Sequence, residues 1–325
     1  MRALASPASL KGVLSAVEAA MALAAGMRTA GLEADELPIA DGGEGTAEVF
    51  AATLGGEWRA APASDPLGRA IRARFLVLED GTVVVEAAEV LGLSLLAEDE
   101  RDPMEASSRG LGELLLAAAA EAGGPILLGL GDTATIDGGA GLLEVVGDEL
   151  GGRELRALCD VRNPLLGERG AARAFGPQKG ASPEQVEELE ERLAAIERLR
   201  PYAHLPGAGA AGGLGAALVA LGGELLSGAD VVFERIDFRG MVRGADLVVT
   251  GEGSVDRSSF EGKAVGEVVR VCQEEDVRCV LFAGLIDAAP PGVEVHALSG
   301  DPRRAADDLV ELGERLARAV GLRIT

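Results

Sequence analysis

Short apolar runs alternate with longer segments of helical period along most of the chain. A predicted strand over 34–40 precedes a helical pattern over 46–54. Near the other end, a predicted helix over 263–275 lies between predicted strands over 245–250 and 277–283. Strands that alternate with helices are typical of parallel sheets with crossover connections. We therefore expect an α/β fold with parallel strands at both ends of the chain.

A hairpin signal interrupts this alternation. Asp80-Gly81 separates the run 71–78 from the β-branched run 83–85, and this dipeptide favours a tight turn between antiparallel strands. We therefore expect a doubly wound domain that is interrupted by a second α/β domain containing some antiparallel strands. The predicted boundaries are 1–66 plus 226–325 for the doubly wound domain and 67–225 for the inserted domain.

Two predicted helices carry capping signals. Ser15 and Glu18 have the spacing of a capping box ahead of a helix predicted over 16–29. The tetrapeptide SPEQ at 182–185 places serine at the N-cap, proline at the first helical position and glutamine at the third. These signals predict where both helices begin.

The turn Asp41-Gly42-Gly43-Glu44 lies between the strand over 34–40 and its helix. Glycine permits positive φ and lets a ligand approach the backbone, and a helix N-terminus attracts anions. Carboxylates hold Mg²⁺ or accept a proton from a hydroxyl group. Together these features favour phosphoryl transfer. A tight turn whose acidic residues cap the helix explains this stretch alone equally well.

Further acidic glycine turns follow other predicted strands. Glu252 stands between two glycines, and Asp256 and Lys263 follow, so that two carboxylates and a lysine surround a strand end. Lys263 could neutralise phosphate charge or be a solvated residue of the first helical turn. Asp137, in another glycine turn, could bind Mg²⁺, accept a proton or cap a helix. Lys11 and Lys179 are the other cations placed to meet anions, although either alone is more often a surface residue.

Two nucleotide-binding motifs are excluded or weakened by their context. Gly207, Gly209 and Gly212 match the dinucleotide fingerprint in letters, but no strand precedes them, so phosphate contact and plain helix packing both stay open. A P-loop is absent, since Arg257 occupies the position of its first glycine and Ala264 follows Gly262-Lys263. Any use of ATP would need another architecture.

Composition limits the chemistry and the partners. The formal net charge of −23 argues against nucleic acid and anionic membranes, so any anion site must be built locally. Only 3% of residues are aromatic against 48% hydrophobic, which predicts a core of alanine, valine and leucine. The chain has three cysteines without a CxxC pair and only two histidines, which leaves carboxylates and lysines to carry chemistry. We expect reduced thiols, no membrane span, no signal peptide and a cytoplasmic location.

Eight motifs run in one order over nearly the whole chain. They are PASLKGVLS at 7–15, LPIADGGEGT at 37–46, DPLG at 65–68, LGLGDTATIDGGAG at 128–141, CDVRNPLLG at 159–167, FGPQKGA at 175–181, LPGAGAAGGLGA at 205–216 and DLVVTGEGSVDRSSFEGK at 246–263. Together they resemble the bacterial glycerate kinase family, the two-domain class without a P-loop. The resemblance implies ATP- and Mg²⁺-dependent phosphorylation of D-glycerate, usually to 2-phosphoglycerate. It also implies a Rossmann-like domain interrupted by a second α/β domain, with the active site in the cleft between them.

The resemblance suggests roles for the residues of these motifs. Lys11 and Lys263 would stabilise phosphate charge or hold the glycerate carboxylate, and Asp137 or Asp256 would be the base. Asp41 and Glu252 would bind the metal. The residues expected to bind substrate or nucleotide are Ser9, Asp41, Gly42, Gly43, Glu44, Gly138, Gly139, Asp160, Gln178, Lys179, Gly209, Gly212, Gly251, Glu252 and Gly253.

The sequence departs from the family pattern at several motif positions. Ala8 replaces an aspartate, Leu10 a phenylalanine, Asp132 a glycine and Ile136 an asparagine. Ser258 replaces a glutamine, Ser259 a threonine and Val265 a proline. The segment between Leu150 and Leu155 is also shorter than in the family. Three alternatives therefore stay open: a member that has lost catalysis and keeps a binding or regulatory role, a kinase of another small hydroxy acid, and, weakest, a nicotinamide dehydrogenase. The sequence leaves a homo-oligomer open.

Overall fold

The computed structural model describes residues 1–147, 149–150, 152–260 and 263–321. The chain forms two compact units. The first unit comprises Met1–Asp41, Glu48–Thr53 and Ala229–Thr325, and the second comprises Gly42–Ala47 and Leu54–Gly228. Residues 54–66, predicted for the first domain, lie in the second unit because Glu57–Ser64 forms a strand of its sheet.

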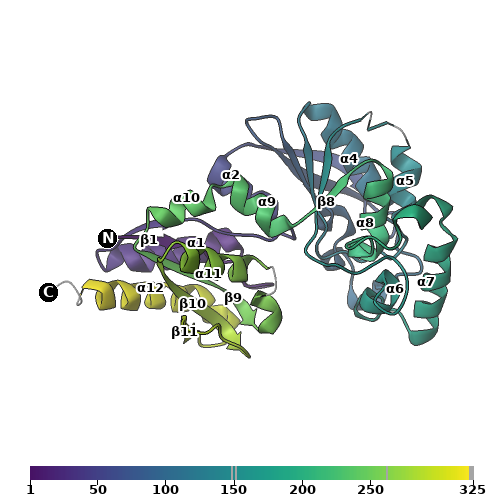
Figure 1. Ribbon diagram of the computed structural model, residues 1–325. Helices are drawn as coiled ribbons and strands as arrows, with labels where there is room; N and C mark the ends of the chain where they lie inside the picture. The colour runs from purple at the N-terminus through teal and green to yellow at the C-terminus, as the bar shows by residue number, and fades with distance from the viewer. Residues whose placement is uncertain (148, 151, 261–262, 322–325) are drawn as a thin grey trace. The chain divides into compact units, whose positions relative to one another are not determined.

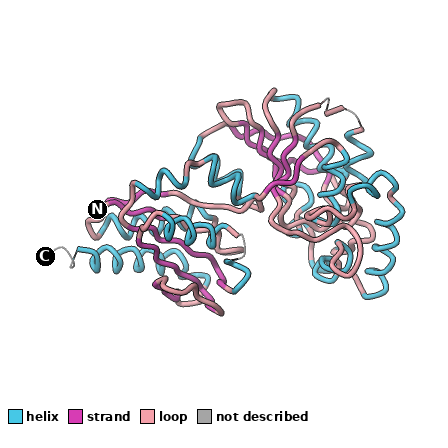
Figure 2. The backbone as a smooth tube through the Cα atoms, viewed as in Figure 1, coloured by secondary structure: helices cyan, strands magenta, loops and turns pink. Residues whose placement is uncertain are grey.

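The first unit contains a five-stranded sheet in which all strands are parallel (Figures 1 and 2). Its strands are β1 (Arg2–Ala5), β2 (Glu33–Glu36), β9 (Leu247–Val255), β10 (Arg278–Ile286) and β11 (Glu294–Ala297). The spatial order is β2-β1-β9-β10-β11. Counted within the unit this is the order 2-1-3-4-5, which is one of the two common doubly wound arrangements. The predicted α/β fold class is confirmed.

Helices cover both faces of this sheet, as expected of a doubly wound arrangement. On one face α1 (Ala16–Thr29) and α12 (Ala305–Gly321) share a core with β1, β9 and β10. The two helices approach closely, because a Cβ atom on Gly26 would lie 2.0 Å from the Val310 carbonyl oxygen. On the other face α11 (Ala264–Glu274) packs against β9 and β10. The unit also contains α9 (Gly228–Arg235, whose first residue belongs to the second unit) and α10 (Phe238–Arg243).

The second unit contains a six-stranded mixed sheet. Its strands, in spatial order, are β3 (Glu57–Ser64), β4 (Ala70–Val77), β5 (Val83–Glu86), β6 (Ile126–Gly129), β7 (Leu155–Leu158) and β8 (Glu224–Leu226). The first three strands are antiparallel neighbours, and β5 to β8 run parallel. The predicted hairpin at Asp80-Gly81 joins β4 to β5, with Gly81 at φ +80°. The prediction of antiparallel strands in the middle of the chain is therefore confirmed.

Helices of the second unit enclose one apolar core on this sheet. They are α3 (Ala88–Leu91), α4 (Arg109–Glu121), α5 (Ala140–Val146), α6 (Ala171–Phe175), α7 (Pro183–Ala195) and α8 (Ala210–Ala220). The helix α2 (Thr46–Leu54) has residues in both units. Both predicted capping boxes are present, at Ser15 on α1 and at Ser182 on α7. No described helix is long and apolar enough to cross a membrane.

The glycine-rich stretch at 207–213 folds differently from a regular helix start. Ala211, Gly212 and Gly213 all have positive φ, so the regular part of α8 begins at 214 as predicted. A Cβ atom on Gly212 would lie 1.9 Å from the Thr135 carbonyl oxygen, and one on Gly209 would lie 2.3 Å from that of Pro164. Close packing of backbone on backbone therefore explains these glycines.

Candidate active site

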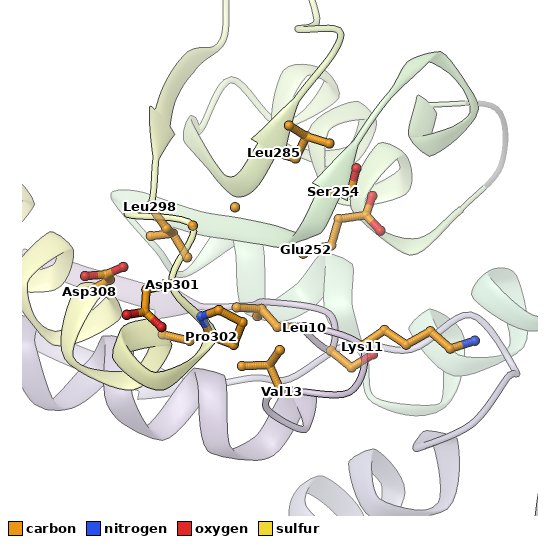
Figure 3. Close-up of a pocket in the computed structure, with 15 residues that line it drawn as sticks. Leu10, Lys11, Val13, Glu252, Ser254, Leu285, Leu298, Asp301, Pro302 and Asp308 are labelled. Carbon is orange, nitrogen blue, oxygen red and sulfur yellow. The ribbon is translucent and has the colours of Figure 1, made fainter. Parts of the chain in front are cut away.

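The first unit contains a cavity at the carboxyl ends of its parallel strands. Its volume is about 530 Å³, and it is lined by the loops that follow β1 and β11, by the last residues of β9 and β10 and by the start of α12. The chain leaves β1 toward one edge of the sheet, to β2, whereas β9 leads through β10 to β11 at the other edge. The cavity therefore lies at the topological switch point, where open α/β sheets bind their ligands. Figure 3 shows its walls, which are formed by Ser9, Leu10, Lys11, Val13, Glu252, Gly253, Ser254, Gly284, Leu285, Leu298, Gly300, Asp301, Pro302, Ala305 and Asp308.

Glu252 lies near the carboxyl end of β9 and lines this cavity. Its Oε1 atom is buried and has no hydrogen-bond partner among the residues described. Burial raises the pKa of its carboxyl group, and the charges of Asp41 and Asp256 raise that pKa further. A hydrogen bond with Ser259 and the positive charge of Lys263 act in the opposite direction. The structure thus brings four predicted site residues into one electrostatic neighbourhood: Asp41, Glu252, Asp256 and Lys263.

Three predicted residues besides Glu252 line the cavity. Ser9 and Lys11 lie on the loop after β1, and Gly253 follows Glu252. Lys11 is exposed, and in Figure 3 its side chain extends away from Pro302 and Asp301. Gly251 has a different role, because a Cβ atom there would lie 2.2 Å from the Phe282 carbonyl oxygen on the neighbouring strand.

In the second unit, a glutamate that the sequence reasoning missed organises the acidic turn at 42–47. Glu86 ends β5, and its carboxylate accepts hydrogen bonds from the N–H groups of Gly45 at 3.2 Å and Ala47 at 2.7 Å. Burial raises the pKa of Glu86 to about 7. Two of the N–H groups at the start of α2 are therefore occupied by the chain's own carboxylate. They are not available to a phosphate, which corrects one use predicted for this turn.

The remaining residues of that turn are placed as a tight connection. Gly42 has φ +86°, and a Cβ atom there would lie 2.6 Å from the Leu158 Cβ atom. The Gly43 carbonyl oxygen accepts a hydrogen bond from the Thr46 hydroxyl group at 2.8 Å. Glu44 is exposed. Packing and turn geometry account for the two glycines without a ligand.

Asp137 is a capping residue. Its Oδ2 atom accepts hydrogen bonds from the Ser108 N–H and hydroxyl groups, at 2.8 and 2.6 Å, and from the Gly141 N–H group at 3.2 Å. Its Oδ1 atom accepts from the Gly139 N–H group at 2.9 Å. Four hydrogen bonds from groups near the start of α4 and α5 favour a structural role for Asp137 over that of a base. Gly138 and Gly139 have φ of +64° and +73°, as the turn before α5 requires.

Lys179 is buried in the second unit rather than exposed to solvent, with only 4% of its surface accessible. Its Nζ atom donates to the Thr133 hydroxyl oxygen at 3.1 Å and to the Thr135 carbonyl oxygen at 2.9 Å. Burial lowers the pKa of Lys179 to about 7, against the opposing influence of Asp137 and Asp132. The lysine therefore ties the loop after β6 to the segment 176–180. The neighbouring Gln178 is exposed.

The last predicted residue, Asp160, follows β7 and accepts a hydrogen bond from the Gly228 N–H group at 3.0 Å. Among the residues described, no group of three histidine, cysteine, aspartate or glutamate side chains is arranged to hold a metal ion. The sequence signal that would have identified Glu86 is a lone carboxylate directly after the fully buried run 83–85. Two positions from the sequence analysis lie outside the described residues. They are Gly262 and Gly151, the latter in the segment between Leu150 and Leu155.

Comparison with known proteins identifies the family of this chain. The model of the glycerate kinase family matches residues 3–154 and 146–301, which together span most of the chain. The chain belongs to the glycerate kinase family. It is therefore a kinase, and the family implies ATP as the phosphate donor. The two matched segments overlap at 146–154.

Relatives and a solved structure agree with this membership of the glycerate kinase family. The chain is 38% identical to a glycerate 2-kinase of Escherichia coli, over 92% of this chain and 89% of the relative. It is 35% identical to a glycerate kinase of Halalkalibacterium halodurans, over 96% and 94%. A crystal structure from Salmonella typhimurium LT2, assigned as a glycerate kinase 2, superposes with a TM-score of 0.85 at 30% identity and covers 99% of this chain and 98% of its own.

The structure explains several departures from the family pattern. Leu10 and Ile136 are 4% and 1% exposed and belong to the apolar cores of their units. Asp132, in the place of a glycine, has φ +58°, a left-handed conformation that aspartate tolerates better than most residues. These three changes are accommodated by packing and backbone geometry.

Proposed function

We propose that this kinase phosphorylates D-glycerate with ATP and Mg²⁺ and releases 2-phosphoglycerate. The family and the name of the Escherichia coli relative support the substrate and the product. The observation in the structure that carries the proposal is Glu252, whose buried oxygen has no hydrogen-bond partner among the described residues at the switch-point cavity. The predicted sharing of the active site by both units and the cytoplasmic location stay predictions.

The residues around Glu252 fit Mg²⁺. In kinase sites this ion keeps several waters and is held by one or two carboxylates together with substrate phosphates, so a cage of three side chains is not needed. Glu252 supplies a buried oxygen that no described residue hydrogen-bonds, and Asp41 supplies a second carboxylate close enough to raise the pKa of Glu252. Bound there, Mg²⁺ would neutralise charge on the transferred phosphoryl group.

The chain's own residues would position the reactants and stabilise charge. Lys11 and Lys263 would hold anionic groups of ATP or glycerate, as compact cations do. Of the two predicted bases, Asp256 suits the role better than Asp137, because Asp137 already accepts four hydrogen bonds. The glycerate hydroxyl oxygen would attack the γ-phosphorus atom as the bond to the bridging oxygen breaks. Asp256 would accept the hydroxyl proton.

An assay of ADP release with Mg-ATP and D-glycerate tests this proposal. Glu252→Gln should lower kcat by about 100-fold or more, since loss of a preorganised charged group commonly costs that much. The matched control is Glu33→Gln, because Glu33 is exposed at the start of β2, at the other edge of the sheet. Equal kcat in Glu252→Gln and wild type would contradict the role of Glu252.

The same assay separates the alternatives. ADP binding without turnover on D-glycerate or on a panel of small hydroxy acids would indicate a member that has lost catalysis. Turnover only with another hydroxy acid would correct the substrate. Phosphorus NMR of the product distinguishes 2-phosphoglycerate from its 3-phospho isomer.

A further inference from the structure

The switch-point cavity has two chemically different ends. Leu10, Val13, Leu298 and Pro302 provide apolar surface at one end, whereas Lys11 is the single cation among the described residues that line the cavity. Figure 3 shows Leu10, Val13 and Pro302 grouped together, with the Lys11 side chain extending away from them. A ligand that spans the cavity would therefore contact apolar groups at one end and a positive charge at the other.

Two apolar side chains that line the cavity are exposed to solvent. Val13 is 37% exposed and Leu285 is 57% exposed, the largest value among the described large apolar side chains. Apolar groups that line a concave, partly open cavity are typical of sites for organic ligands. They offer contact surface that the protein core leaves unused.

A flat backbone surface lies between these apolar walls. Gly253 on β9 pairs with Gly284 on β10, because their neighbours Glu252 and Ala283, and Ser254 and Leu285, are register partners. A Cβ atom on Gly253 would meet no atom nearer than 3.6 Å, which is ordinary contact, and its φ is not positive. Neither packing nor backbone conformation requires glycine at 253, so space for a ligand explains it better.

The apolar end of the cavity also contains two hydrogen-bond acceptors. Asp301 and Asp308 line it, and their carboxylates are held in place by Arg303 and Arg304. Both carboxyl groups have lowered pKa values: hydrogen bonds from Arg303 act on Asp301, and, against the opposing effect of burial, hydrogen bonds from Ser299 and the charge of Arg304 act on Asp308. Both therefore stay negative at neutral pH. Each carboxylate is paired with an arginine and can still accept hydrogen bonds from sugar hydroxyl groups.

We propose that this cavity binds the nucleoside half of ATP, with the purine between Val13 and Leu298 and the phosphates directed toward Glu252 and Lys11. The orientation rests on the proposed kinase function and adds to it the polarity of the nucleotide in the site. The cavity volume of about 530 Å³ lies in the range of sites that enclose organic ligands. The purine contacts apolar side chains, the ribose lies near Asp301, and the charged groups reach the basic end.

Calorimetric titration with two probes tests this orientation. Adenosine carries no phosphate and reports the apolar end alone, whereas Mg-ADP reports both ends. Val13→Asp should weaken the binding of both probes by about tenfold or more, the scale of a lost apolar contact in a pocket. Lys11→Ala should weaken Mg-ADP binding and leave adenosine binding within about twofold.

Matched variants keep the result interpretable. Val13→Leu preserves the apolar wall and should bind both probes as wild type does. Met21→Asp places the same charge on an apolar residue that is 53% exposed on α1, outside the cavity, and should also leave binding unchanged. Unfolding curves of all variants show that each is folded at the temperature of the titration.

The outcomes separate this inference from the proposed function. Adenosine binding that is unchanged in Val13→Asp, or weakened by Lys11→Ala as strongly as Mg-ADP binding, would overturn the orientation. Absence of Mg-ADP binding to wild type would overturn the site. If wild type fails to phosphorylate D-glycerate while the two variants still separate the probes, the nucleoside site stands and only the proposed acceptor is wrong.

Discussion

The two units use a buried glutamate at the end of a parallel strand in opposite ways. In the second unit, both oxygens of Glu86 accept backbone hydrogen bonds from the start of α2. In the first unit, one oxygen of Glu252 is buried at a cavity without a hydrogen bond from the described residues. Burial raises the pKa of both groups. A buried carboxylate therefore indicates a ligand site only where the protein has not already satisfied it.

Lysines show the same contrast. The chain has three, Lys11, Lys179 and Lys263, and all lie in glycine-containing motifs, whereas arginines supply nearly all the ion pairs of the described surface. Lys11 and Lys263 are exposed in the first unit, but Lys179 is buried in the second. Similar motif positions thus leave the lysine exposed in one unit and use it for loop packing in the other.

Replacement of Lys179 should have the largest effect on this contrast. Its pKa of about 7, lowered by burial, lies below the ordinary 10.5, so the unfolded chain binds more protons between these values. The free energy of unfolding should then rise with pH over this window, by about 5 kcal/mol in full. Lys179→Met should lack this rise. Urea unfolding at pH 7 and pH 9.5 measures it, with the exposed Lys11→Met as the control.

If wild type and Lys179→Met gain stability in parallel between pH 7 and 9.5, the pKa of Lys179 is not lowered in the folded protein. The conclusion that Lys179 is buried in the packing of this loop would then be wrong.

Glu86 should act in the opposite direction and at lower pH. Burial raises its pKa from 4.5 to about 7, so the folded chain binds more protons between these values. Stability should fall as pH rises through this window, by about 3 kcal/mol. Glu86→Gln cannot titrate and should be free of this fall. Its amide cannot accept from both N–H groups, so the variant should be less stable at pH 5 by about 1 kcal/mol.

Thermal or urea unfolding of wild type, Glu86→Gln and the exposed control Glu33→Gln between pH 5 and 7.5 checks this expectation. Curves for wild type and Glu86→Gln that keep a constant separation would mean that Glu86 does not change protonation in that range.

Local sequence signals predicted most of the elements correctly. The capping boxes at Ser15 and Ser182 and the turn at Asp80-Gly81 depend on residues close in sequence, and all three are present. The alternation of strands and helices predicted the fold class for the same reason. Residues 54–66 belong to the second compact unit, and no local pattern shows that β3 pairs with β4 in the second sheet.

The use of each site residue could not be predicted from local patterns. Glu86 reaches the turn at 42–47 across about forty residues of sequence, so the sequence alone made the N–H groups of α2 look available to an anion. Lys179 looked like a surface cation because its contacts, Thr133 and Thr135, are equally remote. Glu252, a candidate from the sequence, lines the cavity, because strand ends and glycines mark such positions even where distances are unknown.

Glu252→Gln should affect stability little, in contrast to Glu86→Gln. The raised pKa of Glu252 means that its ionised form costs folding free energy above pH 4.5, and the neutral amide avoids that cost. Because the residue is partly exposed, solvent keeps this gain small. Urea unfolding measures this value alongside the activity assay. A loss of several kcal/mol would indicate that Glu252 is structural, as Glu86 is, and would remove the contrast between the units.

The smallest effect concerns the loop that Lys179 holds. Asp132 adopts φ +58°, where a residue with a Cβ atom is strained and glycine is not. Asp132→Gly should therefore be more stable than Asp132→Ala by about 1 kcal/mol, with the wild type between them because aspartate tolerates this conformation better than alanine. Chemical unfolding of the three proteins at one pH ranks them. Equal stability of the glycine and alanine variants would show that the loop after β6 relaxes when Asp132 is replaced, and that Lys179 does not hold it rigidly.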